Sequence, residues 1–330
     1  MPIPSLLKGC LTLPVMASPM FIISGPELVI SQCKAGIVGS FPSLNARPAE
    51  ELSRWLTKIE GELAAAKLEN PESRIAPYAV NLIVHPSNLR LEKDLAVCVE
   101  HRVPLVITSL SPPESVVPAV HSYGGLVFHD VINVRHARKA VTAGVDGLIL
   151  VCAGAGGHGG TLSPLALVAE VRSFFDGPIL LSGAISRGDQ ILAAQAMGAD
   201  MAYIGTRFIA SSEANAVSDY KAMVTKSTMA DIVYTDLFTG VKGNYLRGSI
   251  EAAGLDPYNL PDRGGLEVRV REEGSKQNAW RDIWGAGQGV GSIDTVMPVA
   301  EIVHSLAREY RQALDRVERQ SAVFLKEIVA

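Results

Sequence analysis

One glycine-rich segment of the sequence has the residue types that chemistry at a bound ligand requires. The segment 152–160 reads CAGAGGHGG, so a single histidine, His158, lies among five glycines. Glycines let the backbone approach a ligand closely and present N–H donors to it. The segment therefore suggests an imidazole that faces a planar cofactor or a substrate. The alternative is a surface histidine in a glycine-rich loop.

Two later segments have the residue types that bind phosphate. Ser182–Ala184 and Gly205–Thr206 each follow a short apolar run and supply backbone amides and a hydroxyl. In many parallel barrels the loops after the last two strands hold a phosphate with such groups. A phosphorylated cofactor lying between these loops and His158 is the simplest hypothesis. Ser186 is a candidate N-cap for the helix that follows.

Two earlier positions belong at the same end of such a barrel. The segment Ser18-Pro19-Met20 follows the first apolar run and forms a turn suited to the edge of a flat ring. Asn81 lies within the apolar run YAVNLI. Its amide is bonded either to the core backbone or to a ligand, and the sequence leaves both readings open.

Three residues are candidates for a substrate pocket. His129 ends the fifth apolar run, while Tyr245 and Gln288 lie in a later part of the chain where aromatic residues and glycines alternate. An interior or capping role is the alternative for His129, and core packing is the alternative for the other two. Trp280 is expected in the core.

Several other chemistries lack their motifs. Gly154, Gly156 and Gly159 spell Gly-x-Gly-x-x-Gly, but they follow the sixth predicted strand, and the next strand ends without an acid for a ribose. The histidines, cysteines and carboxylates have no metal-ligand spacing. There is no Gly-x-Ser-x-Gly elbow of a serine hydrolase, and no lysine for a Schiff base lies within a predicted strand.

Eight apolar runs of strand length alternate with helix-length segments and would position these residues. The predicted strands are 13–18, 36–41, 78–83, 104–109, 125–129, 146–151, 178–182 and 200–204. Clear helices are predicted at 26–34, 49–68, 91–101 and 163–175, and Gly144 and Gly198 each end a further helix. This order predicts an α/β fold, a (β/α)8 TIM barrel, with an open doubly wound sheet as the competitor.

The regular alternation of predicted strands and helices ends after Gly205. Residues 207–296 are predicted to form a smaller, mainly helical cap domain over the barrel mouth, inserted before the last helix at about 298–326. The barrel domain would then comprise residues 1–206 and 297–330. A cap in this position would exclude water from a site at the strand ends.

The composition excludes several classes of protein. Hydrophobic residues make up 48% of the 330 residues, charged residues 19%, and the net charge is −4. No basic run suggests a nucleic-acid partner, and no apolar run is long enough to span a membrane. The four cysteines are scattered, without disulfide or zinc spacing, which favours reduced thiols and a cytoplasmic location.

Several segments together resemble the nitronate monooxygenase (2-nitropropane dioxygenase) family. In order they are PVMASPM, YAVNLIV, HDVINVRHARKAVTAGVDGLIL, AGAGGHGG, LLSGAI and MGADMAYIGTRF. The likeness covers about residues 11–210, and DIWGAGQ at 282–288 extends it. Members of this family are FMN-dependent TIM-barrel oxidoreductases. They oxidise alkyl nitronates with O2 to a carbonyl compound and nitrite.

The resemblance implies roles for individual residues. His158 would be catalytic, orienting the nitro oxygens or taking the α-proton of a neutral nitroalkane. A small-molecule substrate and O2 would be the partners, and a homodimer is the candidate assembly. The residues implied to bind FMN are Ser18, Pro19, Met20, Asn81, Gly156, Gly157, Ser182, Gly183, Ala184, Gly205 and Thr206.

Three positions depart from what the resemblance leads one to expect. Val151 stands where many relatives have a polar residue, Asp130 where some carry a lysine near the flavin, and Ala184 where a second glycine is common. These departures leave two alternatives open. One is an NAD(P)H-dependent flavin reductase of quinones or enoyl thioesters, and the other is a phospho-ligand-binding or FMN-carrying protein without turnover.

Overall fold

Eight parallel strands form a barrel in the computed structural model, which describes residues 3–261 and 280–328. The strand order is β1-β9-β8-β6-β5-β4-β3-β2, and Ala17 N–H donates to Val38 O to close the ring between β1 and β2. All eight predicted strands are confirmed, with shifted ends: β1 Val15–Ala17, β2 Gly39–Pro42, β3 Tyr78–Val84, β4 Leu105–Leu110, β5 Leu126–Val131, β6 Gly147–Val151, β8 Ile179–Ser182 and β9 Met201–Ile204.

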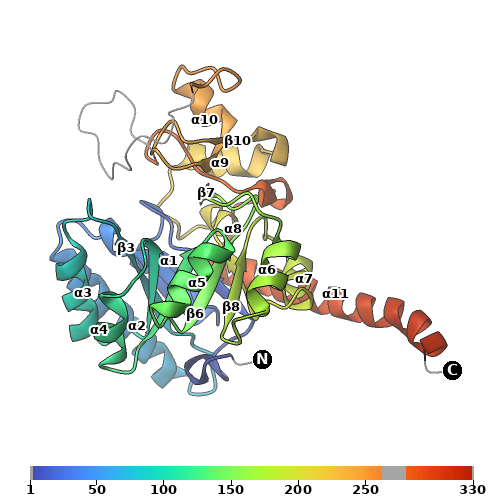
Figure 1. Cartoon of the computed structure of the whole chain (residues 1–330), viewed down its shortest axis with the longest axis horizontal. Coiled ribbons are helices and arrows are strands. Elements are labelled where there is room, and N and C mark those ends of the chain that lie inside the picture. The colour runs from blue at the N-terminus through green and yellow to red at the C-terminus, as the bar shows by residue number, and fades with distance from the viewer. Residues whose placement is uncertain (1–2, 262–279, 329–330) are drawn as a thin grey trace.

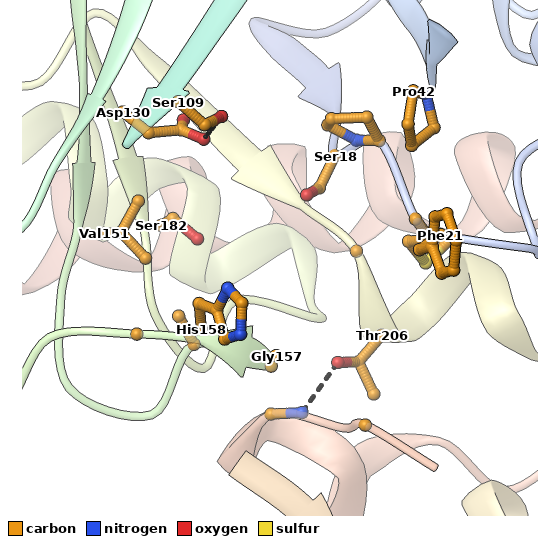
Figure 2. A pocket seen from close by; sticks show the side chains of 18 of the residues that line it. Ser18, Phe21, Pro42, Ser109, Asp130, Val151, Gly157, His158, Ser182 and Thr206 are labelled. Atoms are coloured by element: carbon orange, nitrogen blue, oxygen red, sulfur yellow. Dashed lines mark hydrogen bonds between the residues drawn. The ribbon is translucent and has the colours of Figure 1, made fainter. Parts of the chain in front are cut away.

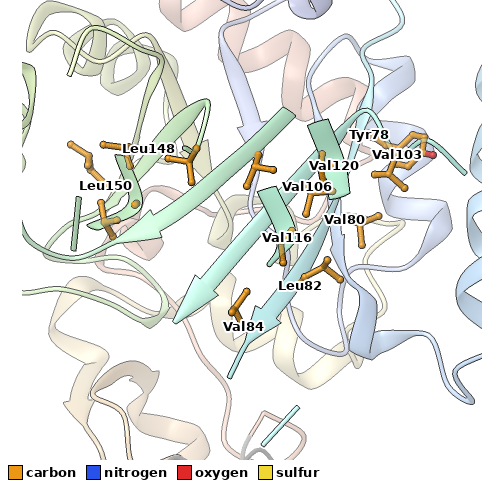
Figure 3. Close-up of a cluster of buried hydrophobic side chains, with 14 of the residues drawn as sticks. Tyr78, Val80, Leu82, Val84, Val103, Val106, Val116, Val120, Leu148 and Leu150 are labelled. Atoms are coloured by element: carbon orange, nitrogen blue, oxygen red, sulfur yellow. The ribbon is translucent and has the colours of Figure 1, made fainter. Parts of the chain in front are cut away.

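Alternate residues of each strand face opposite sides of the barrel wall. On β4, Leu105 and Ile107 belong to the cluster inside the barrel, whereas Val106 belongs to the cluster between strands and helices. Figure 3 shows Val80, Leu82 and other members of this outer cluster beside the strands. Because both faces are covered, the strands appear in the sequence as continuous apolar runs.

Helices surround the barrel as the βα order requires (Figure 1). Gly144 and Gly198 have φ of 86° and 104°, so each takes the left-handed position that ends a helix, as predicted. The final helix packs against α7 and α1 and completes the ring, while its far end extends away from the barrel. The helices are α1 Pro26–Lys34, α2 Glu51–Glu69, α3 Leu91–Glu100, α4 Val116–His121, α5 Val134–Thr142, α6 Pro164–Arg172, α7 Gly188–Ala196, α8 Thr206–Ile209 and α11 Val299–Ile328.

The segment predicted as a cap contains a small antiparallel sheet as well as helices. Strand β11 (Gly243–Leu246) pairs with β10 (Ile232–Thr235) on one side and with β7 (Gly157–His158) of the glycine-rich loop on the other. Helices α9 (Ser218–Lys226) and α10 (Arg247–Ala252) lie beside it (Figure 1). The prediction missed these strands because none exceeds four residues, which is too short for a clear alternation. Residues 262–279 of this segment lie outside the described residues.

Within the described ranges 3–261 and 280–328, no helix is both long enough and apolar enough to cross a membrane.

Candidate functional site

A cavity of about 800 Å³ opens at the carboxyl ends of the barrel strands. This volume lies within the range of pockets that hold cofactors and drug-sized ligands. The lining includes the glycine-rich loop, the loops after β1, β8 and β9, and residues of the 207–296 segment. The predicted residues that line it are Ser18, Pro19, Met20, Asn81, Gly156, Gly157, His158, Ser182, Gly183, Ala184, Gly205 and Thr206.

A chain of polar side chains lies at the inner end of the cavity. The amide of Asn81 donates to Ser109 Oγ at 2.9 Å, and that hydroxyl donates to Asp130 Oδ2 at 2.6 Å. The three residues come from β3, β4 and β5 and occupy the inward-facing positions of those strands. Figure 2 shows Ser109 and Asp130 beside one another at this end of the pocket.

Two buried polar atoms near this chain have no partner among the described residues. They are Oδ1 of Asp130 and the hydroxyl of Tyr203, and both residues line the cavity. Burial raises the pKa of Asp130 to about 7, although the hydrogen bond from Ser109 opposes this shift. Burial also raises the pKa of Tyr203 well above its usual value. Unpaired buried groups are costly, so these two atoms point to a ligand with hydrogen-bonding groups.

The loops after β8 and β9 form a cradle of backbone at the cavity. Gly183 and Ala184 have positive φ values of 138° and 56°. The N–H groups of Gly183 and Ala184 donate to no described residue. A Cβ atom at Gly183 would lie 2.7 Å from the carbonyl oxygen of Ala153, so only glycine fits there. Thr206 Oγ1 accepts a hydrogen bond from Gly287 N at 2.8 Å, which joins this cradle to the 207–296 segment (Figure 2).

His158 projects into the cavity from β7 (Figure 2). Its Nε2 atom lies 2.8 Å from Thr239 Oγ1, and the edge of its ring meets Trp280 at a centroid distance of 5.4 Å. Burial lowers the pKa of His158 to about 4. The imidazole is therefore neutral at neutral pH, and one of its two nitrogens is unprotonated.

None of the three residues predicted for the substrate pocket lies in the cavity lining. His129 faces outward on β5 and contacts Thr108 Oγ1 at 2.8 Å, because its neighbour Asp130 takes the inward position. Tyr245 is fully buried and packs against Phe238. Gln288 is exposed, and its backbone N–H donates to Gly154 O.

Ser186, the serine proposed as an N-cap, has a different role. Ser186 donates its hydroxyl hydrogen bond to Gly289 O at 2.8 Å and lies beside Ser292, so it does not cap α7. Gln190 accepts instead from the backbone N–H groups of Ser186 and Arg187. This arrangement ties the loop after β8 to the segment that contains Gly289.

Three polar residues of the lining were not assigned to the site by sequence reasoning, namely Ser109, Tyr203 and Thr239, and Asp130 was noted only as a departure from the family. A signal existed for Ser109, Asp130 and Tyr203. Counting by two along β4, β5 and β9 from their buried interior residues places these side chains inside the barrel. Thr239 had no such signal, because it lies 81 residues from His158 in the sequence.

Comparison with known proteins gives a consistent family. The nitronate monooxygenase family model matches residues 5–309. A nitronate monooxygenase of Paraburkholderia phytofirmans is 24% identical, over 93% of this chain and 94% of that protein. A putative monooxygenase of Mycobacterium tuberculosis is 28% identical over 68% of this chain, and the match spans 64% of that protein.

Solved structures share the fold. A nitroalkane oxidase from Streptomyces ansochromogenes superposes with a TM-score of 0.76 at 24% identity, covering 95% of this chain and 100% of that one. FabK from Thermotoga maritima gives a TM-score of 0.75 at 24% identity, covering 96% of this chain and 97% of that one. At this identity the two likenesses establish the barrel architecture.

Proposed function

Because the chain belongs to the nitronate monooxygenase family, we propose that it is an FMN-dependent enzyme that oxidises alkyl nitronates with O2. The products would be a carbonyl compound and nitrite. The family makes the chain a flavin oxidoreductase. The identity of the flavin as FMN, the nitronate substrate and the use of O2 are the parts that we propose.

The residues at the cavity fit a flavin that carries a phosphate. The amides of Gly183 and Ala184 are suited to bind the phosphate oxygens, because they are otherwise without acceptors among the described residues. Asp130 and Tyr203 provide the unpaired polar atoms that the carbonyl and nitrogen atoms of a flavin ring would satisfy. When bound, FMN supplies the electron transfer, and the protein supplies binding, orientation and electrostatics.

The chain's own contribution to the reaction centres on His158. Its imidazole lines the cavity in a loop whose backbone is fixed by pairing with β11. A neutral ring in that place keeps one unprotonated nitrogen, which can accept the α-proton of a neutral nitroalkane. Trp280 and Phe238 line the same cavity and present apolar surface, which limits access of water to the substrate.

The observation that carries the proposal is the projection of His158 into a cavity whose polar groups fit a flavin. We expect His158→Gln to retain flavin and to lower kcat/KM for a neutral nitroalkane about 100-fold, a typical contribution of a positioned acid–base group. Steady-state oxygen consumption measures the rate, and the flavin absorbance of the purified variant reports binding. An unchanged rate in a variant that still holds flavin would remove His158 from the mechanism.

Anaerobic mixing distinguishes the nitronate reaction from the reductase alternative. We expect an alkyl nitronate to bleach the flavin absorbance of the wild-type enzyme and NADH or NADPH to leave it unchanged. Rapid bleaching by a nicotinamide, with no response to nitronate, would instead favour a reductase. A protein that binds flavin but responds to neither compound would be a carrier.

A further inference from the structure

The hydrogen bonding of His158 depends on a residue outside the barrel. Thr239 is buried in the turn between β10 and β11, and its Oγ1 lies 2.8 Å from His158 Nε2. Pairing of β11 with β7 brings the two together, because Gly243 lies opposite His158 in that ladder. The contact thus joins the glycine-rich loop to the 207–296 segment at the residue with the proposed chemistry.

The hydrogen bonds of Thr239 determine which ring nitrogen of His158 carries the proton. The hydroxyl has one hydrogen, and it donates to Val241 O at 3.0 Å. That carbonyl has no other donor among the described residues. The hydroxyl oxygen accepts from Val241 N at 3.4 Å, and Tyr245 Oη lies 3.5 Å away. With the hydroxyl hydrogen bonded to Val241 O, Thr239 accepts from His158, and this arrangement places the ring proton on Nε2.

Protonation of Nε2 leaves the other ring nitrogen of His158 with an open lone pair. The ring is neutral at neutral pH because burial lowers its pKa to about 4. Nδ1 makes no hydrogen bond to any described residue, and the ring lines the cavity. A neutral imidazole nitrogen with no protein partner is the form that accepts a proton from a bound substrate.

We propose that Thr239 is a positioning residue that holds His158 in the Nε2–H tautomer, so that Nδ1 removes the α-proton of a neutral nitroalkane. This rests on the proposed function. In the step, the Cα–H bond breaks and its proton moves to Nδ1. The electron pair forms the C=N bond of the nitronate, and the negative charge moves onto the nitro oxygens.

The tautomer is tested directly by nitrogen NMR of the flavin-loaded protein with ¹⁵N-labelled histidine. The signal of His158 is assigned by its loss in His158→Gln. We expect the Nε2–H form in the wild type and in the control Thr239→Ser, which keeps the hydroxyl. Thr239→Val has a similar size but no acceptor, so a mixture of tautomers is expected. An Nδ1–H form in the wild type, or an unchanged spectrum in Thr239→Val, would overturn the assignment.

The role in proton transfer is tested by comparing two substrates. We expect Thr239→Val to lower kcat/KM for a neutral nitroalkane about tenfold, the effect of losing one hydrogen bond to the base. The kcat/KM for the matching nitronate should change by less than about twofold, since no α-proton is removed from it. Thr239→Ser should restore the wild-type ratio of the kcat/KM for the nitroalkane to that for the nitronate. An equal loss with both substrates would overturn this role. If the wild type uses neither compound, the proposed function fails, whereas the NMR spectrum still decides the tautomer.

Discussion

At the scale of single residues, the inner end of the cavity contains a buried carboxyl group, that of Asp130, with one oxygen that has no hydrogen-bond partner among the described residues. Asp130 accepts one hydrogen bond from Ser109 and leaves its second oxygen unpaired, and the hydroxyl of Tyr203 in the same lining is also unpaired among the described residues. No cation pairs with this carboxyl among the described residues. Burial without a countercharge favours the neutral acid, which can donate a hydrogen bond that a carboxylate cannot.

The neutral form of Asp130 leads to a prediction about how the free energy of unfolding depends on pH. The pKa of Asp130 is about 7 in the folded protein against 3.8 for a free side chain, so between these values the folded state holds a proton that the unfolded state releases. The contribution of Asp130 to the free energy of unfolding should therefore be highest at low pH and fall as the pH rises toward 7. Asp130→Asn cannot ionise. It should be more stable than the wild type by about 4 kcal/mol at about pH 8, and by little at about pH 4.

Urea unfolding of the ligand-free protein at the two pH values measures this difference. Asp176→Asn is the matched control, because it makes the same carboxyl-to-amide change at an exposed position. A stability gain for Asp130→Asn that does not change with pH would contradict a neutral buried acid.

At the scale of elements, the last helix completes the barrel through a close contact with α7. Gly188 begins α7, and its N–H donates to Glu309 Oε2 at 2.8 Å. A Cβ atom at Gly188 would lie 2.1 Å from Leu306 O and 2.3 Å from Tyr310 N. Glycine at this position lets the backbones of α7 and α11 meet. The loop after β8, which contributes to the cavity, leads directly into this contact.

The contact predicts a selective loss of stability. Gly188→Ala should lower the free energy of unfolding by about 3 kcal/mol, because the added methyl group forces the two helices apart. Gly61→Ala is the matched control: Gly61 lies in α2 with open space around it, and alanine there should add up to about 1 kcal/mol. Denaturant unfolding of both variants tests the pair. Equal effects of the two substitutions would show that the packing of α11 does not depend on the close backbone contact at Gly188.

At the scale of the whole molecule, the cavity is assembled from segments that are distant in the chain. The glycine-rich loop, the loops after β8 and β9, and Gly287 of the later segment meet only when the barrel has closed and β11 has paired with β7. A ligand that touches all of them binds the folded state alone. Its binding free energy is therefore added to the stability of the whole fold.

This linkage predicts how flavins should affect thermal unfolding. At 100 times its dissociation constant, FMN should stabilise the ligand-free protein by about 2.7 kcal/mol, which raises Tm by roughly 4 °C. Riboflavin, which lacks the phosphate, is the matched control and should raise Tm less at the same concentration. Calorimetry or dye-based melting gives the comparison. Equal shifts with both flavins would contradict phosphate binding by the backbone of Gly183 and Ala184.

The sequence by itself determined the features that depend on local patterns. Strands buried on both faces must be continuous apolar runs, and Gly144 and Gly198 mark left-handed helix ends, so the order of the barrel could be predicted. The glycine-rich loop around His158 and the cradle after β8 and β9 were predicted for the same reason. Their composition indicates a ligand whatever surrounds them.

Only the tertiary structure decided which side chains meet at the cavity. Whether His129 or Asp130 faces inward depends on strand register, and a shift of one residue exchanges the two faces. Thr239 reaches His158 through the pairing of β11 with β7, short strands that only contacts with the rest of the molecule stabilise. Local propensity cannot specify such pairs, because the free energy that forms them comes from burial of the assembled barrel and its neighbouring segment.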